Sequence, residues 1–138
     1  MAEDDPEDRM LAKEAFEKNR IANELFFVED GEELMDYLYQ RGKFTDMPCP
    51  KPGLLLLDIS MPRKNGFEAL KEIRADPKLK MIPVVVLTCS QAEADIVKAY
   101  DLGVNSFISK PMTFNGLVDV VHTLNKYWLG IVELPPVA

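Results

Sequence analysis

Polar side chains follow the apolar runs of this sequence, each near the point where a run ends. They are Glu3, Asp4 and Asp5 near the start, Asp58 after four leucines, Thr88 after a valine-rich run, and Lys110 after Phe107-Ile108-Ser109. Carboxylate oxygens suit Mg²⁺, which takes one or two carboxylates, waters and a phosphate oxygen. A lysine and a hydroxyl can hold further phosphoryl oxygens, and a carboxylate can form an aspartyl phosphate. These residue types predict phosphoryl-transfer chemistry if the fold brings them together.

Asp58 is the strongest of these candidates. It ends the apolar run that starts at Leu54. Burial of a carboxylate in that position costs free energy, which indicates that the group has a function. Thr88 and Lys110 are functional candidates only because both, like Asp58, follow a predicted strand. Asp5, which is followed by Pro6, is expected to cap a helix. We therefore predict a site centred on Asp58.

The elements that must position this site alternate along the chain, with proline and glycine at the boundaries. The expected strands are Glu24–Val28, Leu54–Leu57, Pro83–Leu87 and Ser106–Ile108. The expected helices are Pro6 to about Asn19, Glu32–Arg41, Gly66–Ala75, Gln91–Leu102, and a helix capped by Thr113 that reaches about Tyr127. Strands apolar on both faces belong to parallel sheets covered on both sides. The pattern predicts a doubly wound parallel α/β sheet, in which ligands bind beyond the carboxyl ends of the strands.

Length and charge narrow the class of protein. The chain has 138 residues, enough for one domain, and carries 16 Lys and Arg against 23 Asp and Glu, a net charge of −7. This charge argues against nucleic-acid and anionic-membrane surfaces. No apolar run approaches the ~20 residues that span a bilayer, and the acidic start is unlike a signal peptide, so a cytoplasmic location is expected. Cys49 and Cys89 are expected to be buried thiols.

Other enzyme classes fit poorly. His122 is the only histidine and follows two valines on a helix, so a Ser-His-Asp hydrolase is disfavoured. The sequence has no GxGxxG and no P-loop motif, which argues against dinucleotide and P-loop nucleotide binding. A haloacid-dehalogenase-type phosphatase would need an acid where Ser60 stands. A flavodoxin would need a phosphate loop rich in hydroxyls and glycine where the chain is acidic.

Taken together, these motifs resemble the receiver domains of two-component response regulators. The matching stretches are Glu3-Asp4-Asp5-Pro6, Leu54 to Asp58 with Met61-Pro62 and Asn65-Gly66, Val84 to Thr88, and Phe107 to Pro111. Within the family, the chain is similar to the single-domain regulators paired with bacterial phytochrome kinases. The stretches that carry this narrower likeness are Gly31 to Leu34, Tyr37-Leu38 through Phe44, Pro62 to Gly66, and Tyr127-Trp128 through Leu134-Pro135.

The resemblance implies a role for each matching residue. Asp58 would accept a phosphoryl group from a kinase histidine. Mg²⁺ would be bound by Asp4 directly, by Glu3 through water, and by the Ser60 backbone carbonyl, with Asp58 as a further ligand. Lys110 would pair with the phosphate, with a cis bond before Pro111. Thr88 would turn to the phosphate, and Phe107 would rotate into the space it leaves.

The function that follows is a phosphoacceptor switch and not an enzyme with a separate substrate. It would accept a phosphoryl group from a sensor histidine kinase on Asp58 in a Mg²⁺-dependent reaction, and phosphorylation would switch partner binding. The alternative is a degenerate receiver that acts as a phosphorylation-independent interaction module. Formation of an acyl phosphate distinguishes the two.

The two ends of the chain carry further expectations. The family's sheet has five strands in the order 2-1-3-4-5, but here only Met1 and Ala2 precede Glu3. The first strand is therefore expected to be truncated, and the natural chain is expected to begin with more apolar residues. A strand donated by a partner chain is the alternative. Residues 1–127 are expected to form the receiver domain. The apolar tail 128–138 would either fold back on the helices of its own chain or cover a two-fold partner's face made of the fourth helix, fifth strand and fifth helix. The family resemblance favours the second arrangement, which gives a homodimer.

Overall fold

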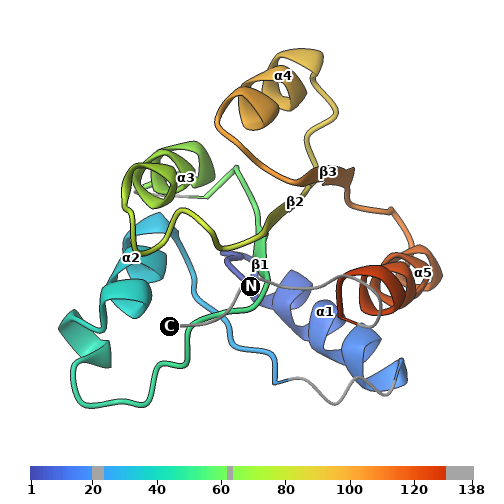
Figure 1. Ribbon diagram of the computed structural model, residues 1–138. Helices are drawn as coiled ribbons and strands as arrows, with labels where there is room; N and C mark the ends of the chain where they lie inside the picture. Colours follow the sequence, from blue (N-terminus) through green and yellow to red (C-terminus); the bar gives the residue numbers. More distant parts are fainter. Residues whose placement is uncertain (20–23, 62–63, 130–138) are drawn as a thin grey trace.

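A computed structural model describes residues 1–19, 24–61 and 64–129 of the chain (Figure 1). The strands are β1 (Leu55–Leu57), β2 (Val84–Thr88) and β3 (Ser106–Ser109). The helices are α1 (Pro6–Lys18), α2 (Gly31–Tyr39), α3 (Gly66–Ala75), α4 (Glu93–Asp101) and α5 (Phe114–Leu124), with a 3₁₀ turn η1 (Gly42–Phe44) and a π-helical turn η2 (Asn125–Leu129). Strands and helices alternate from β1 onward, as the sequence predicts.

The regular sheet has the order β1-β2-β3, and all its strands are parallel. Ala2 extends the sheet beyond β1, because it forms parallel bridges to both Leu57 and Val28. The extended segments therefore lie in the order 24–28, 1–3, β1, β2, β3. This is the order 2-1-3-4-5, which confirms the predicted fold class.

The regular strand predicted for Glu24–Val28 is wrong. Only Val28 is bridged, because the neighbouring segment pairs with it over residues 1–3 alone. Two of the five extended segments therefore contribute single bridges in place of strands.

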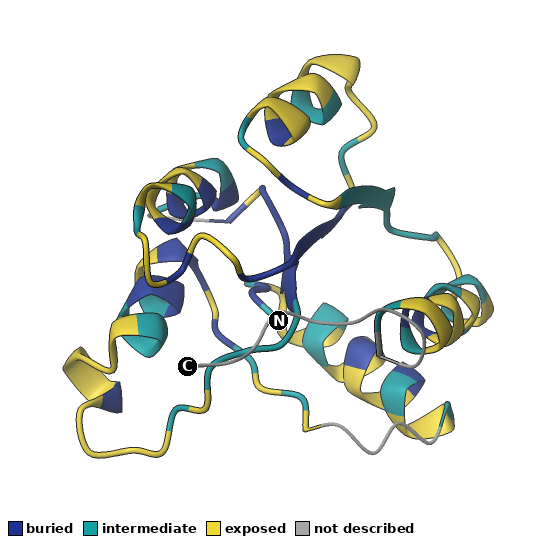
Figure 2. Ribbon diagram, viewed as in Figure 1, coloured by how far each residue is buried: buried dark blue, intermediate teal, exposed yellow. Residues whose placement is uncertain are grey.

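The strand side chains alternate between two cores, one on each face of the sheet. Leu55, Leu57, Val84 and Val86 belong to the larger core, together with residues of α2 and α3. Leu56 and Val85 belong to the smaller core, with residues of α1 and α5. Figure 1 shows α2 and α3 on one side of the strands and α1 and α5 on the other, and in Figure 2 β1 and β2 are buried throughout. A run apolar on both faces is required for this position.

Local capping fixes where the helices begin. The Asp5 carboxylate accepts a hydrogen bond from the Glu7 N–H at 2.8 Å and starts α1, as predicted. Asn65 and Glu68 form a capping box at the start of α3, and the Thr113 hydroxyl caps α5. The last α-helix ends at Leu124, and the chain continues in the π-helical turn η2. The predicted end near Tyr127 is therefore right for helical structure in general but wrong for the α-helix.

The structure tests the expectation that both cysteines are buried. Cys49 is half-buried and Cys89 is exposed, so the prediction of buried thiols is wrong for Cys89. Cys89 comes directly after Thr88, the last residue of β2, and so lies outside the strand whose residues are all buried. None of the helices in the described ranges is both long and apolar enough to cross a membrane.

Candidate functional site

Asp58 lies at the carboxyl end of β1 and is buried, with 5% of its surface exposed. One carboxylate oxygen, Oδ1, accepts hydrogen bonds from the Thr88 hydroxyl at 2.8 Å and from the Ser60 N–H at 3.0 Å. The other oxygen, Oδ2, accepts from the Lys110 ammonium at 3.3 Å. The three predicted residues Asp58, Thr88 and Lys110 are therefore in direct contact.

Gly66 allows the first turn of α3 to approach the backbone of Asp58. A Cβ atom at this position would lie 2.5 Å from the Asp58 carbonyl oxygen and 2.7 Å from the Cα of Ile59. The Gly66 N–H donates to the Ile59 carbonyl at 3.3 Å. Only glycine fits such a close approach without moving the loop that presents Asp58.

Glu3 and Asp4 lie beside Asp58, and each of the three can place a carboxylate oxygen within 4.8 Å of the others. Glu3 is 1% exposed, whereas Asp4 is not buried. The bridges of Ala2 bring the pair to this position. Three hard oxygen donors at this separation fit a divalent cation of the Mg²⁺ type. Asp5 caps α1, as expected, and is not in this group.

Lys110 is the cation at the centre of the cluster. Its ammonium donates to Glu3 in a short contact, to Asp8 at 3.0 Å and to Asp58 at 3.3 Å. It reaches the cluster from the end of β3, where its backbone N–H is anchored to the Thr88 carbonyl at 2.7 Å. One lysine therefore partly neutralises three carboxylates.

The surroundings of this pair raise the pKa of Glu3 and keep Lys110 charged. Burial raises the pKa of Glu3 to about 7, and the nearby Lys110 offsets part of this effect. For Lys110, burial alone would lower the pKa, but its hydrogen bonds to Glu3 and Asp8 and the charge of Asp58 raise it above the ordinary value. A divalent cation binding here would compete with the proton on Glu3.

Two contributors escaped the sequence analysis. Asp8 joins Lys110 from the first turn of α1, and Arg9 donates from Nη1 to the carbonyl oxygens of Glu3 and Asp4 at 2.8 and 3.0 Å. An acid in the first turn of a helix is ordinarily explained by the helix dipole. The sequence therefore gives no sign that Asp8 contacts a distant lysine. Nothing in the local sequence pattern distinguishes Arg9 from a solvated arginine.

The other predicted residues differ in how they relate to the site. Phe107 is half-buried and packs against the larger core, and its N–H donates to the Tyr100 hydroxyl at 3.2 Å. Ser60 is exposed, and the role of its carbonyl as a metal ligand stays a prediction. The expected cis bond before Pro111 is absent from the described residues. His122 is exposed on α5.

Comparison with known proteins gives consistent matches over nearly the whole chain. The family model for "Response regulator receiver domain" matches residues 1–122. Response regulator Rcp1 of Synechocystis sp. is 38% identical over 135 residues, which cover 98% of this chain and 90% of that protein.

Solved structures agree with these matches. The phosphorylated cyanobacterial phytochrome response regulator RcpA is 41% identical, with a TM-score of 0.89 over 98% of this chain and 95% of that chain. The Mn²⁺-bound form of Rcp1 is 38% identical, with a TM-score of 0.88 over 98% and 96%. A response regulator in red light signalling of R. palustris, RPA3017, is 33% identical with a TM-score of 0.91, over 98% and 95%.

Proposed function

This chain belongs to the family of response regulator receiver domains, and from that premise we propose that it is a phosphorylation-dependent switch whose phosphoacceptor is Asp58. The observation that carries the proposal is the contact of Asp58 with both Thr88 and Lys110. These are a hydroxyl and an ammonium that can each donate to phosphoryl oxygens. A carboxylate that is 95% buried is held in place for the reaction by these donors.

The phosphoryl group would come from a histidine of a sensor kinase. An Asp58 oxygen attacks the phosphorus, the bond from phosphorus to the histidine nitrogen breaks, and that nitrogen keeps the electron pair. The product is an acyl phosphate on Asp58. The chain turns over no separate substrate in this scheme, so we propose a phosphoacceptor and not an enzyme in the ordinary sense.

The carboxylates of Glu3, Asp4 and Asp58, with the Ser60 carbonyl, would hold Mg²⁺. Their oxygen atoms fit the preference of this ion, and the Rcp1 structure contains the related ion Mn²⁺. Bound Mg²⁺ supplies positive charge that offsets the charge on the transferred phosphoryl oxygens. The role of Arg9 is to hold the backbone that carries Glu3 and Asp4.

Phosphorylation would be sensed by rearranged hydrogen bonds. The added group carries about −1.5 to −2 charges, so it attracts the Lys110 ammonium away from Glu3 and Asp8. The Thr88 hydroxyl, which now donates to Asp58, would donate to a phosphoryl oxygen. The β3 backbone next to Phe107 would carry this change to the surface near α4.

We propose phytochrome-type sensor kinases as partners, because the most similar solved structures include regulators named for phytochromes. Transfer from an ATP-using kinase implies a cytoplasmic site of action. The face made of α4, β3 and α5 would form a homodimer, since α4 exposes Val97 and Tyr100. Of the predicted tail 128–138, residues 130–138 lie outside the described residues.

Incubation with Mg²⁺ and acetyl phosphate tests the proposal. Intact mass should show one added phosphoryl group that is lost in alkali. Asp58→Asn, nearly isosteric, should remove it and keep the circular dichroism spectrum, whereas Asp119→Asn on the exposed side of α5 should leave it. Labelling of the Asp58→Asn protein at the unchanged rate contradicts the proposal. Absence of any labelling of the natural chain, with Mg²⁺ bound, favours the interaction module.

Lys110→Ala separates phosphorylation from response. Mg²⁺ binding should be retained or strengthened, since the carboxylates lose a competing cation. Phosphorylation should no longer shift the dimerisation constant measured by sedimentation, because the phosphoryl oxygens lose their link to β3. An equal shift with and without Lys110 contradicts this role.

A further inference from the structure

Asp8 contacts the phosphoacceptor site, but the chemistry proposed for that site gives it no task. Its Oδ2 accepts a hydrogen bond from the Lys110 ammonium at 3.0 Å, whereas the Asp58 oxygen lies 3.3 Å from the same nitrogen. Within the described ranges, the acids that can share a cation are Glu3, Asp4 and Asp58, and Asp8 is not among them. Asp8 is therefore a partner of Lys110 that stands outside the candidate metal site.

The backbone holds Asp8 in this position. It is the third residue of α1, which begins at Pro6 after the Asp5 cap. The next residue, Arg9, donates to the carbonyl oxygens of Glu3 and Asp4, and so ties this helical turn to the segment that carries the carboxylates. If the Lys110 ammonium moves, Asp8 can follow it only by rotation of its own short side chain.

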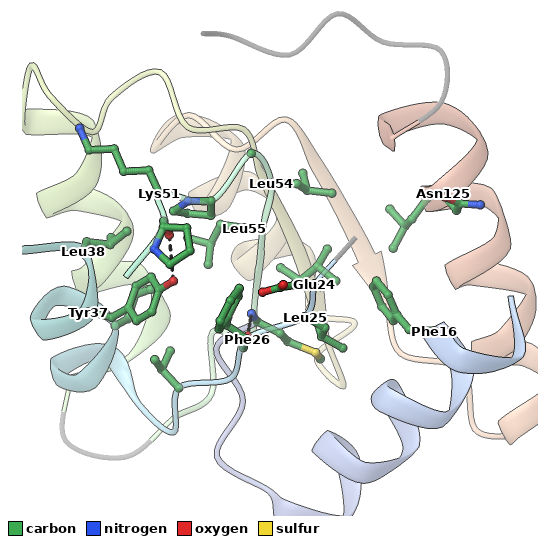
Figure 3. A pocket seen from close by; sticks show the side chains of 18 residues that line it. Phe16, Glu24, Leu25, Phe26, Tyr37, Leu38, Lys51, Leu54, Leu55 and Asn125 are labelled. Carbon is green, nitrogen blue, oxygen red and sulfur yellow. Dashed lines mark hydrogen bonds between the residues drawn. The ribbon is translucent and has the colours of Figure 1, made fainter. Parts of the chain in front are cut away.

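The partners of Lys110 differ in their access to water. The Asp8 side chain is 33% exposed, but that of Glu3 is only 1% exposed. Asp8 and Lys110 also line a small cavity of about 150 Å³ between α1 and the start of α5. A larger cavity of about 490 Å³ lies at the amino ends of the strands (Figure 3), and neither residue lines it. Water can therefore reach Asp8 and replace the ammonium there at little cost.

The ammonium of Lys110 has no hydrogen to spare. It carries three N–H groups, and Glu3, Asp8 and Asp58 accept from it. A new hydrogen bond to a phosphoryl oxygen must therefore replace one of these. Glu3 is buried and in short contact with the ammonium, so losing that bond leaves a buried carboxylate unpaired. The bond to Asp8 is the one that can be exchanged with the smallest loss.

We propose that Asp8 is a positioning residue that holds the Lys110 ammonium away from the phosphoryl position and so opposes the phosphorylated state. The proposal rests on the function proposed above and adds a regulatory residue to it. Asp8 pairs with Lys110 only while the phosphoryl position is empty. The hydrogen bond between the two therefore stabilises the unphosphorylated protein and sets how strongly an anion on Asp58 is held.

The affinity for beryllofluoride tests this role. This anion occupies the phosphoryl position on a carboxylate without being hydrolysed, so calorimetric titration in saturating Mg²⁺ measures an equilibrium. Asp8→Ala should bind it about fivefold more tightly than the natural chain, the upper range for a partly exposed ion pair. A merely structural role predicts the opposite sign, because a damaged site binds the anion less tightly.

A second substitution separates the hydrogen bond from the charge. Asp8→Asn removes the same charge as Asp8→Ala but keeps an oxygen that can accept from Lys110. It should tighten binding only about twofold. Equal effects of the two substitutions would mean that charge alone acts, and they would overturn the positioning role.

Two controls complete the series. Asp8→Glu keeps both the charge and an acceptor, so it should restore the natural affinity to within about 1.5-fold. Glu7→Gln removes an exposed acid from the same helical turn and should also change the affinity less than about 1.5-fold. Circular dichroism of each variant verifies that α1 is intact.

The outcomes distinguish this proposal from the one on which it rests. Binding by the natural chain but not by Asp58→Asn supports the phosphoacceptor assignment, whatever Asp8 does. In that case an unchanged or weaker affinity in Asp8→Ala overturns the positioning role alone. Absence of binding by the natural chain overturns both.

Discussion

The carboxyl ends and the amino ends of the extended segments differ in their hydrogen bonding and packing. At the carboxyl ends, the Asp58 carboxylate has three hydrogen-bond donors, and the Lys110 ammonium contacts three carboxylates. At the amino ends, residues 24–26 and 54–55 border a largely apolar cavity of about 490 Å³. One end is a tightly bonded polar cluster and the other is an incompletely packed core.

This contrast separates chemistry from stability. The polar cluster is held by side chains that arrive from several loops, so its composition decides what can bind. The space at the amino ends is incompletely filled by side chains, so additional apolar contacts there would raise the free energy of unfolding. Substitutions at the carboxyl ends should therefore change binding and phosphorylation, and substitutions near the cavity should change the free energy of unfolding.

The largest effect is expected from a pair of leucines in the larger core. Leu70 is fully buried in α3, whereas Leu34 lines the cavity. Leu70→Ala should lower the free energy of unfolding in urea by about 3–5 kcal/mol, and Leu34→Ala by about 2 kcal/mol, because the latter loses fewer packed neighbours. Equal losses would mean that the cavity is filled in solution.

The second comparison tests the polar end with two adjacent acids. Asp4→Asn should weaken Mg²⁺ binding about tenfold or more, because it removes a carboxylate from the cluster. Asp5→Asn should change it less than about threefold and should keep α1, since Asn also caps helices well. Isothermal titration of Mg²⁺ measures both. Similar losses in the two variants would contradict the assignment of Asp4 as ligand and Asp5 as cap.

The third expectation concerns pH. The pKa of Glu3 is raised from 4.5 to about 7 in the folded state, so between these values the unfolded chain releases a proton that the folded chain keeps. The metal-free protein should therefore lose stability as pH rises through this window, by roughly 2 kcal/mol. Mg²⁺ should stabilise more strongly at pH 8 than at pH 6.

Glu3→Gln is the control for the pH effect, because an amide does not titrate. The variant should lose this part of the pH dependence in denaturant titrations. If its unfolding free energy follows the same slope as the natural chain, another group is responsible.

The smallest effect is expected at Asp8. Its side chain is one-third exposed, so its ion pair with Lys110 is partly screened by water. Asp8→Asn should lower the free energy of unfolding by less than about 1 kcal/mol in thermal or urea unfolding. The exposed Asp119→Asn serves as a reference. A loss above about 2 kcal/mol would show that Asp8 is a structural part of the cluster.

Local patterns predicted most of the elements and failed at identifiable places. The α3 helix was predicted with its observed ends, because Asn65 and Asp76 mark both boundaries. The strand at Glu24–Val28 was wrong, because a strand needs a paired neighbour along its length and pairing is not a property of one segment. The burial of Cys89 was wrong because the covered part of β2 ends at Thr88, and where the cover ends depends on the packing of the layers.

The sequence by itself determined the alternation of strands and helices, the caps, and the placement of Asp58, Thr88 and Lys110 at the ends of apolar runs. These follow from periodicity and capping, which act within a few residues. Only the tertiary structure decided that Lys110 contacts Glu3 and Asp8, 107 and 102 residues away, and that a cavity opens beside Met1. Such contacts depend on how distant loops converge and on the volume left between packed layers, and neither is encoded in any short stretch of the chain.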